Sequence, residues 1–228
     1  MTSSGTTNFG LSNASITLAA FSRIGVRRTS LLQEHLIDAQ QEMNLMQVQF
    51  NNLTPNLWKV DLISTPLVAG TATYSVLPST TQILDAYISY VGSPQSDRLI
   101  FPISRTEYAS YPNKTAQGVP SVFWFDRLIS PTITLWLVPD ATAAYTLNYY
   151  RAVQIQDANL ASGETPDVPY RWLDAMVAEL AYRMARNWKP ELEQVRKMDA
   201  KEAWTIAATQ DQENVALNIY PGLASYFT

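Results

Sequence analysis

The sequence predicts an α+β protein, in which the first and last helices form one bundle and a small antiparallel β module is inserted between them. Apolar residues recur at helical spacing before residue 54 and again after residue 169. The segment between them is rich in Thr, Val, Ile and Tyr and is broken by prolines, as strands and turns are. We expect these parts: a flexible arm at 1–13, a helical bundle domain at 14–57 and 166–214, an inserted β-rich domain at 58–165, and an extended C-terminal docking tail at 215–228.

The composition sets limits on function. The 228 residues are 46% hydrophobic, which is enough to bury a sizeable core. Sixteen Lys and Arg against twenty Asp and Glu give a net charge of −4, which argues against a free-standing nucleic-acid binder. The chain has no Cys, so it has no thiolate nucleophile and no Cys-based metal site. No run of about 18 apolar residues occurs, and we expect no membrane span.

The first predicted helix follows the polar arm "MTSSGTTNFGLSNAS". Asn13 and Ser15 are cap-type residues at its start, and Gly25 is a typical residue at its end. One face of this short helix carries Ile16, Ala20 and Ile24.

A long helix is predicted from Ser30 onward, because apolar residues alternate at spacings of four and three. This spacing is typical of a helix that packs lengthwise on others. The predicted stripe consists of Leu32, Leu36, Ala39, Met43, Met46, Phe50 and Leu53.

Strands are predicted at 122–128, 132–138 and 145–153, with Ser130-Pro131 as a hairpin turn between the first two. Before them, we expect a short helix or turn at 107–111 and a surface loop at 112–120. Together the strands indicate a small antiparallel sheet or sandwich.

Two C-terminal helices are predicted on either side of Pro190. The first covers 169–187, places Leu173, Val177, Leu180 and Met184 on one stripe, and carries a Glu179–Arg183 ion pair on its side. Pro190 ends that helix but suits the first turn of the next, so we expect a break at Trp188-Lys189-Pro190.

Catalytic and metal-site patterns are weak. His35 is the only histidine, and without a second His or any Cys we interpret it as a solvated or bundle-edge residue. The loop "NKTAQG" lacks the glycine spacing of a phosphate-binding loop. Acids that a glycoside hydrolase would need in a pair are present, but we interpret them as turn or edge residues: Asp85, Glu107, Asp126 and Asp140. We expect no enzyme activity and no cofactor.

The aromatic run before Arg127 allows two interpretations. Strand alternation places Phe123 and Phe125 on one face and Trp124 on the other, which favours core or interface roles. The alternative is a carbohydrate-binding β module on a helical stalk, using Trp124, Trp136 and Tyr149 as a stacking platform.

Two further groups are candidates for contacts with other molecules. Arg23, Arg27 and Arg28 lie at the end of the first helix, where they either stabilise its negative end or face DNA. An apolar, aromatic C-terminal end is a candidate for docking in a partner's groove, and it consists of Ile219, Tyr220, Leu223, Tyr226 and Phe227.

Three stretches carry a resemblance to a known family: "FPISRTEYASYPNKTAQGVPSVFWFDR", "PTITLWLVPDATAAYTLNYYRAV" and "DVPYRWLDAMVAELAYRMA". With the order helix, β module, helix, the chain resembles the head-to-tail adaptor proteins of tailed bacteriophages, also called gateway or tail tubular A-type proteins. The resemblance covers roughly Leu18 to Ala207.

The resemblance implies a structural virion protein at the capsid vertex, assembled in the host cytoplasm. It implies a homo-oligomeric ring, commonly of about twelve subunits in this family, with two different patches on each subunit. The implied partners are the phage portal protein, the tail nozzle or next connector, and double-stranded DNA that passes through the channel without sequence-specific contacts. The bundle and the C-terminal tail are then expected to meet the portal, and the β module the tail side.

Overall fold

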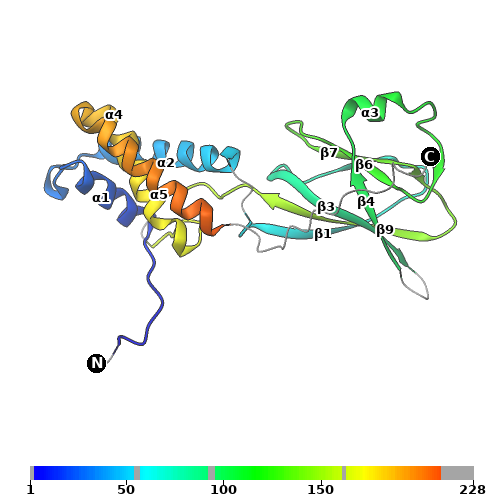
Figure 1. Ribbon diagram of the computed structural model, residues 1–228, viewed down its shortest axis with the longest axis horizontal. Helices are drawn as coiled ribbons and strands as arrows, with labels where there is room; N and C mark the ends of the chain where they lie inside the picture. Colours follow the sequence, from blue (N-terminus) through cyan, green and yellow to red (C-terminus); the bar gives the residue numbers. More distant parts are fainter. Residues whose placement is uncertain (1–2, 54–56, 92–95, 161–162, 212–228) are drawn as a thin grey trace, which may run out of the picture.

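The chain forms an elongated molecule with helices at one end and strands at the other (Figure 1). The structure is a computed structural model that describes residues 3–53, 57–91, 96–160 and 163–211. The predicted α+β class is confirmed. The predicted C-terminal tail lies outside the described residues.

Within the described residues, the helical part consists of four longer helices and three single turns of 3-10 helix. Their bounds are α1 Asn13–Arg23, η1 Arg28–Ser30, α2 Gln33–Leu53, η2 Tyr170–Trp172, α4 Leu173–Trp188, η3 Pro190–Leu192 and α5 Glu193–Gln210. The β part contains the short helix α3, Arg105–Ser110, which agrees with the turn predicted at 107–111.

Helix α1 forms as the apolar spacing predicts, because Ile16, Ala20 and Ile24 are all buried. Its N-cap is Ser12, whose Oγ accepts a hydrogen bond from the Ser15 backbone N–H at 3.2 Å. Asn13 is the first helical residue and not the cap. At the other end Gly25 has φ 78°, a conformation that glycine adopts without strain.

Helix α2 buries the middle of its predicted stripe but not the two ends. Ala39, Met43, Met46 and Phe50 are buried, whereas Leu32 is 59% exposed and Leu53 is 53% exposed. The prediction for these two leucines was wrong, because Leu32 precedes the first helical residue and Leu53 is the last one. His35 takes the buried position near the start of the helix.

Helix α4 is the centre of the bundle and contacts α1, α2 and α5. Its predicted stripe is confirmed, since Leu173, Val177, Leu180 and Met184 are buried. The helix ends at Trp188, and Lys189 leaves helical geometry with φ −148° and ψ 64°. Pro190 then opens η3, as the predicted break requires.

A curled sheet of seven strands forms the other end, in the order β1-β9-β3-β4-β6-β7-β2. Neighbouring strands are antiparallel except β4 and β6, which run parallel. A second, two-stranded sheet pairs β5 with β8 in parallel. The bounds are β1 Val60–Pro66, β2 Thr73–Ser75, β3 Thr80–Val91, β4 Asp97–Pro102, β5 Gln117–Gly118, β6 Val122–Asp126, β7 Thr132–Trp136, β8 Val138–Pro139 and β9 Ala144–Val153.

The predicted strands are present, β6 and β7 with shorter limits and β9 with one more residue at its start. Strands β6 and β7 pair through the turn that contains Ser130-Pro131, and β9 follows the prediction closely. Two differences arise from tertiary contacts: the predicted loop at 112–120 contributes β5, and the segment predicted as 132–138 divides into β7 and β8. Strand pairing between distant segments is set by the whole fold, not by local periodicity.

The molecule has two hydrophobic cores that share no residue. One lies in the bundle around Trp172 and Met176, and the other lies inside the curled sheet around Phe123 and Leu147. The boundaries predicted for the two domains stay a prediction.

Candidate functional site

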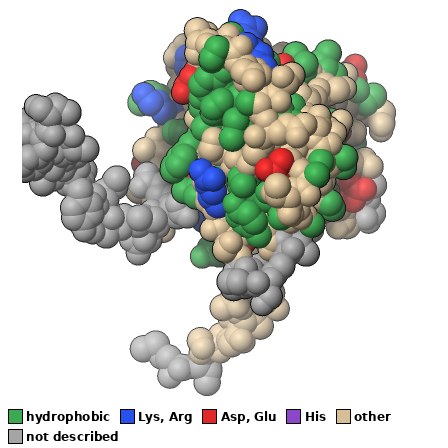
Figure 2. Space-filling view, turned by 90° about the vertical axis from the view of Figure 1, so that its right-hand side faces the viewer, with side chains coloured by type: hydrophobic (Ala, Val, Ile, Leu, Met, Phe, Trp, Pro, Cys, Tyr) green, Lys and Arg blue, Asp and Glu red, His purple; other side chains and the backbone are tan. Residues whose placement is uncertain are grey.

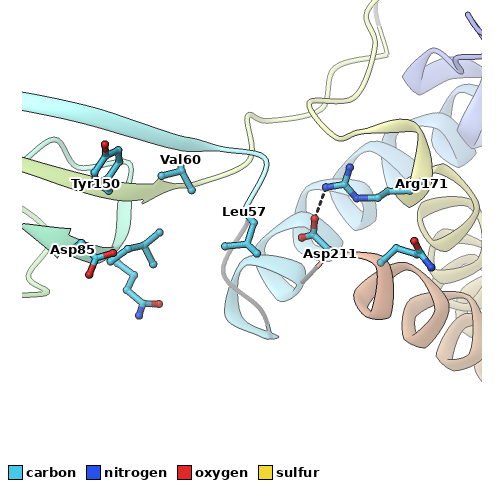
Figure 3. A pocket seen from close by; sticks show the side chains of 9 residues that line it. Leu57, Val60, Asp85, Tyr150, Arg171 and Asp211 are labelled. Atoms are coloured by element: carbon cyan, nitrogen blue, oxygen red, sulfur yellow. Dashed lines mark hydrogen bonds and ion pairs between the residues drawn. The ribbon is translucent and has the colours of Figure 1, made fainter. Parts of the chain in front are cut away.

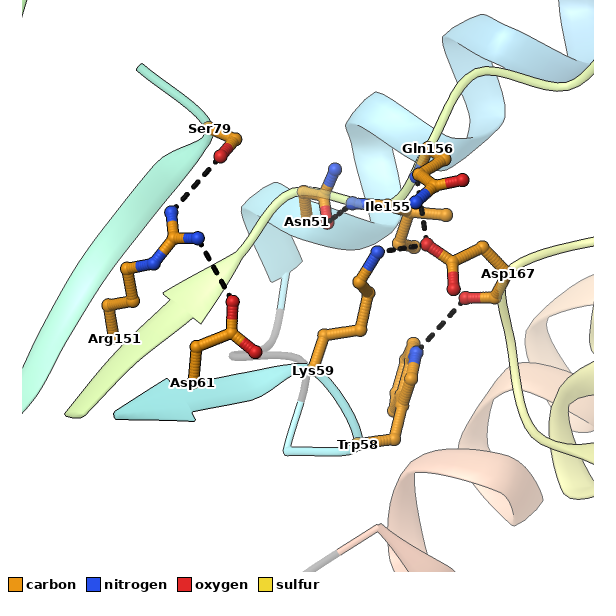
Figure 4. Close-up of polar contacts among 9 residues, drawn as sticks. All are labelled: Asn51, Trp58, Lys59, Asp61, Ser79, Arg151, Ile155, Gln156 and Asp167. Carbon is orange, nitrogen blue, oxygen red and sulfur yellow. Dashed lines mark hydrogen bonds and ion pairs between the residues drawn. The ribbon is translucent and has the colours of Figure 1, made fainter. Parts of the chain in front are cut away.

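The junction between bundle and sheet is held by a small polar network centred on Asp167 (Figure 4). The Lys59 ammonium pairs with the Asp167 carboxylate, and the Gln156 backbone N–H donates to the same oxygen at 3.2 Å. The Trp58 indole N–H donates to the Asp167 backbone carbonyl at 3.2 Å. These contacts join the chain entering the β module to the chain leaving it.

Arg151 fixes the adjoining edge of the sheet. Its guanidinium pairs with Asp61 at 2.9 Å and donates to the hydroxyls of Ser79 and Thr80 at 3.1 Å (Figure 4). The side chain is buried, so these partners replace the water that the charge loses. Strands β1, β9 and the start of β3 are thereby tied together next to the junction.

A wide cavity of about 830 Å³ lies between the two parts of the molecule (Figure 3). Arg171 of η2 pairs with Asp211 on the helical side, and Asp85 and Tyr150 line the sheet side. The remaining lining residues are Leu57, Val60, Gln82, Leu84 and Gln210. Among the described lining residues the carboxylates are Asp85 and Asp211, and Asp211 is engaged by Arg171, whereas glycoside chemistry needs two carboxylates that are free to act.

The other candidate acids are spread over the β module. Glu107 lies in the first turn of α3, and Asp126 lies at the end of β6. Asp140 accepts hydrogen bonds from the Thr142 hydroxyl at 2.6 Å and the Tyr145 hydroxyl at 2.9 Å, and the Thr142 hydrogen bonds hold its pKa below the usual range. Among the described residues, no group of three or more His, Asp or Glu side chains is placed to hold a metal ion.

His35 is a packing and capping residue of the bundle. Its ring stacks on Trp188 with centroids 4.0 Å apart and meets the edge of Phe21 at 5.7 Å. Its Nδ1 accepts a hydrogen bond from the Leu32 backbone N–H at 3.1 Å. The side chain is buried between Trp188 and Phe21, so the prediction of a solvated residue was wrong.

The tryptophans of the predicted platform are covered by α3 and the loop that follows it. Tyr108 lies 5.6 Å from Trp124, and Tyr111 stacks on Trp136 at 4.4 Å between ring centroids. The Trp136 indole N–H donates to the Asn113 backbone carbonyl at 2.9 Å. These contacts occupy one face of each tryptophan ring and the indole N–H of Trp136, which a sugar platform would need to be free.

Tyr149 lies apart from this aromatic group. It is 2% exposed and packs in the core inside the sheet, where burial raises the pKa of its hydroxyl. Phe123 is buried in the same core, and Phe125 packs against it, as strand alternation predicts. The three residues proposed as a sugar platform therefore do not share an exposed surface.

The arginine cluster divides into two roles. Arg23, in the last turn of α1, pairs with Asp174 in the first turn of α4 at 2.5 Å. Each charge lies at the helix end that favours it. Arg27 and Arg28 are exposed and form no ion pair within the described part of the chain.

Arg183 forms a buried charge network, whereas the sequence predicted only an ion pair with Glu179 on the side of the helix. Its guanidinium donates to Glu179 at 3.0 Å and to Glu42 of α2 at 2.9 Å, and it also contacts the Gln49 side chain. The predicted Glu179–Arg183 pair is present, but both residues are buried in the bundle. The acidic residue on α2 that completes the network has no signal in the local spacing.

Exposed apolar side chains mark surfaces that the sequence analysis did not identify. On the β module they include Val68, Leu99, Phe101 and Ile129, which is 98% exposed at the β6–β7 turn. Seen from this end, the molecule shows hydrophobic side chains in separate patches divided by polar surface and single charges (Figure 2). The predicted docking residues of the C-terminal tail, from Ile219 to Phe227, lie outside the described residues.

Comparison with protein families gives a match over almost the whole chain. The model of the family described as SU10 adaptor protein matches residues 15–219. The chain belongs to the SU10 adaptor protein family. The match includes both the helical and the β part of the molecule. No curated protein matches the chain.

Membership makes the chain a bacteriophage adaptor protein, with a structural role in the virion. This supports the prediction that the chain is a structural protein that assembles with other virion components. No described helix of the adaptor is both long and apolar enough to cross a membrane.

Proposed function

We propose that this adaptor is a head-to-tail connector that joins the portal ring to the tail as a ring of about twelve copies. The observation that carries the proposal is family membership across an elongated chain with a helical bundle at one end and a sheet at the other. Such a chain has two distant ends for contacts with two different neighbours. In the cavity between the two parts, Arg171 and Asp211 pair with each other, which suits a structural role.

The bundle is proposed to face the portal, and the β module to face the tail nozzle or the next connector. The described part of α5 leads to Asp211 beside the junction, and the predicted tail 215–228 follows it in the sequence. The apolar and aromatic residues of that tail suit insertion between portal subunits. The exposed apolar patches of the β module suit contacts on the tail side (Figure 2).

DNA is proposed to pass through the ring without sequence-specific contacts. Arg27 and Arg28 are the candidates for contacts with the phosphate backbone, because both are exposed and neither forms an ion pair in the described part of the chain. Phosphate contacts carry no sequence information. A net charge of −4 keeps such contacts weak, which suits a channel that DNA must leave.

Native mass spectrometry of the adaptor with and without its portal protein tests the proposal. We expect the adaptor alone to be a monomer or a loose oligomer, and to join the portal as a ring of defined copy number. An adaptor that stays monomeric and unbound at micromolar portal concentrations would contradict it.

A further inference from the structure

Helix α2 has a second apolar face that nothing in the described chain covers. Ile37, Leu45 and Val48 are 50%, 57% and 45% exposed, and they lie opposite the buried Met43 and Phe50. A surface helix of a globular protein normally has one apolar stripe and a polar opposite side. Three exposed apolar side chains over about 17 Å of one helix face are typical of an interface.

The same helix carries only negative charge. Its ionised residues are Glu34, Asp38 and Glu42, and it has no Lys or Arg. Glu42 is used inside the molecule by Arg183. Glu34 and Asp38 lie one turn apart, next to the exposed Ile37, and neither forms an ion pair in the part of the chain that is described.

A groove of about 440 Å³ lies between α2, α4 and α5, and its apolar lining and positive charges complement the outer face of α2. Its apolar lining comes from Phe50, Leu53, Tyr182 and Trp204. Lys197 and Lys201 stand one turn apart on the α5 side of this groove, are exposed, and form no ion pair in the described residues. The groove therefore offers an apolar floor beside two free ammonium groups.

We propose that the outer face of α2 in one copy docks in the α4–α5 groove of the next copy. Ile37, Leu45 and Val48 then meet the apolar groove, while Glu34 and Asp38 pair with Lys197 and Lys201. The inference rests on the proposed ring, and it identifies the two surfaces through which neighbouring copies contact each other. The two surfaces are different patches of one chain, so each copy leaves one of each free and successive copies add in the same sense until the ring closes.

Charge complementarity favours a second copy of the chain, and not DNA, as the binding partner of the α2 face. Carboxylates without any cation on the helix repel phosphate. Opposite charges on the two faces also fix the register in which neighbouring copies meet.

Cysteine cross-linking in assembled particles tests the interface, because the natural chain has no Cys. In phage that carry the adaptor with both Val48→Cys and Lys201→Cys, mild oxidation is expected to give a ladder of adaptor multimers. Either single variant is expected to give no adaptor dimer, since the two positions lie on different patches. Both residues are exposed, so neither change removes a buried contact.

Each result has a defined meaning. Particles that contain the adaptor but yield no ladder overturn the interface and leave the proposed connector role standing. Dimers formed by Val48→Cys alone overturn it as well, because they indicate a two-fold contact. Wild-type particles that lack the adaptor would overturn the proposed function, and the interface with it.

Charge reversal gives a second readout that does not depend on cysteine geometry. Glu34→Lys with Asp38→Lys is expected to lower adaptor incorporation at least tenfold, and Lys197→Glu with Lys201→Glu to do the same. Combining all four changes is expected to restore it, which a purely structural defect would not allow. Glu202→Lys, an exposed change elsewhere on α5, is the matched control and is expected to have no effect. Failure of the combined variant to recover would contradict the pairing.

Discussion

Arg183 shows how a single residue holds the bundle together. Its guanidinium lies among Glu179, Glu42 and Gln49, and so joins α4 to α2 through charges that are shielded from water. A buried charge is tolerated only when its partners are in place. Removing the cation leaves the buried Glu179 carboxylate without its partner, and leaves Glu42 with only Arg186 at 3.8 Å.

The change Arg183→Met is therefore expected to destabilise the protein by about 3–5 kcal/mol. Urea unfolding followed by circular dichroism measures the loss. Arg186→Met is the matched control, because Arg186 is more exposed and lies 3.8 Å from the same Glu42 carboxylate. Equal, small effects of the two variants would contradict the role given to Arg183.

The lowered pKa of Asp140 predicts that the stability of the protein depends on pH. Hydrogen bonds from Thr142 lower its pKa in the folded state, so the folded state releases this proton more readily than the unfolded chain. Its contribution is complete above the unfolded pKa of roughly 3.9 and is lost as the pH falls through the folded value.

Asp140→Asn is expected to lower the urea midpoint at pH 7 and to reduce the fall in stability between pH 5 and pH 3. Asp157→Asn, at an exposed aspartate, is the matched control. An unchanged pH profile for Asp140→Asn would show that its hydrogen bonds carry no net stabilisation.

At the scale of elements, the junction is where two independent cores are coupled. Polar contacts around Asp167 join the two connecting segments, and Asn51 of α2 accepts a hydrogen bond from the Ile155 backbone N–H at 3.3 Å. Trp58 also packs on Trp172 of the bundle, with ring centroids 5.3 Å apart. Polar junctions of this kind open more easily than packed cores.

Asp167→Ala is expected to raise amide hydrogen exchange at Gln156 by roughly tenfold, because that N–H loses its acceptor. Exchange in the centre of α4, near Met176 and Leu180, is expected to stay unchanged. Asp174→Ala, which removes the exposed pair with Arg23 in the first turn of α4, is the control. Protection of Gln156 that survives Asp167→Ala would contradict a junction centred on this carboxylate.

The elements that follow from local periodicity are the ones that the sequence predicts well. Leu173, Val177 and Met184 repeat at helical spacing, and all three are buried in α4. The partners of Arg183 could not be predicted in the same way, since Glu42 is distant in the chain and meets it only after α2 packs on α4.

In the candidate site, too, local periodicity predicts some features, and others depend on tertiary packing. Alternation correctly separates Phe123 from Trp124, but it does not reveal that Tyr111 covers Trp136 or that Tyr149 faces the core. Those contacts depend on the curl of the sheet and on the path of the loop after α3. The second apolar face of α2 was hidden because Leu45 and Val48 interleave with the stripe that packs inward.

At the scale of the whole molecule, the proposed role predicts that the C-terminal segment is needed for attachment and not for folding. Deleting residues 215–228 is expected to abolish co-purification with the portal, while the helical circular dichroism signal and the urea midpoint stay unchanged. Replacing the five apolar residues, from Ile219 to Phe227, with serine in the full-length chain is the matched variant. Portal binding that persists in both would rule out the tail as the docking segment.

The central claim is that this adaptor forms the ring between portal and tail, and a cryo-EM reconstruction of the native particle's vertex tests it most directly. The account predicts one ring of adaptor subunits, with the bundle against the portal, the β module toward the tail, and α2 of each copy against α5 of the next. Density that places the chain away from the portal, or in no ring at all, would contradict it.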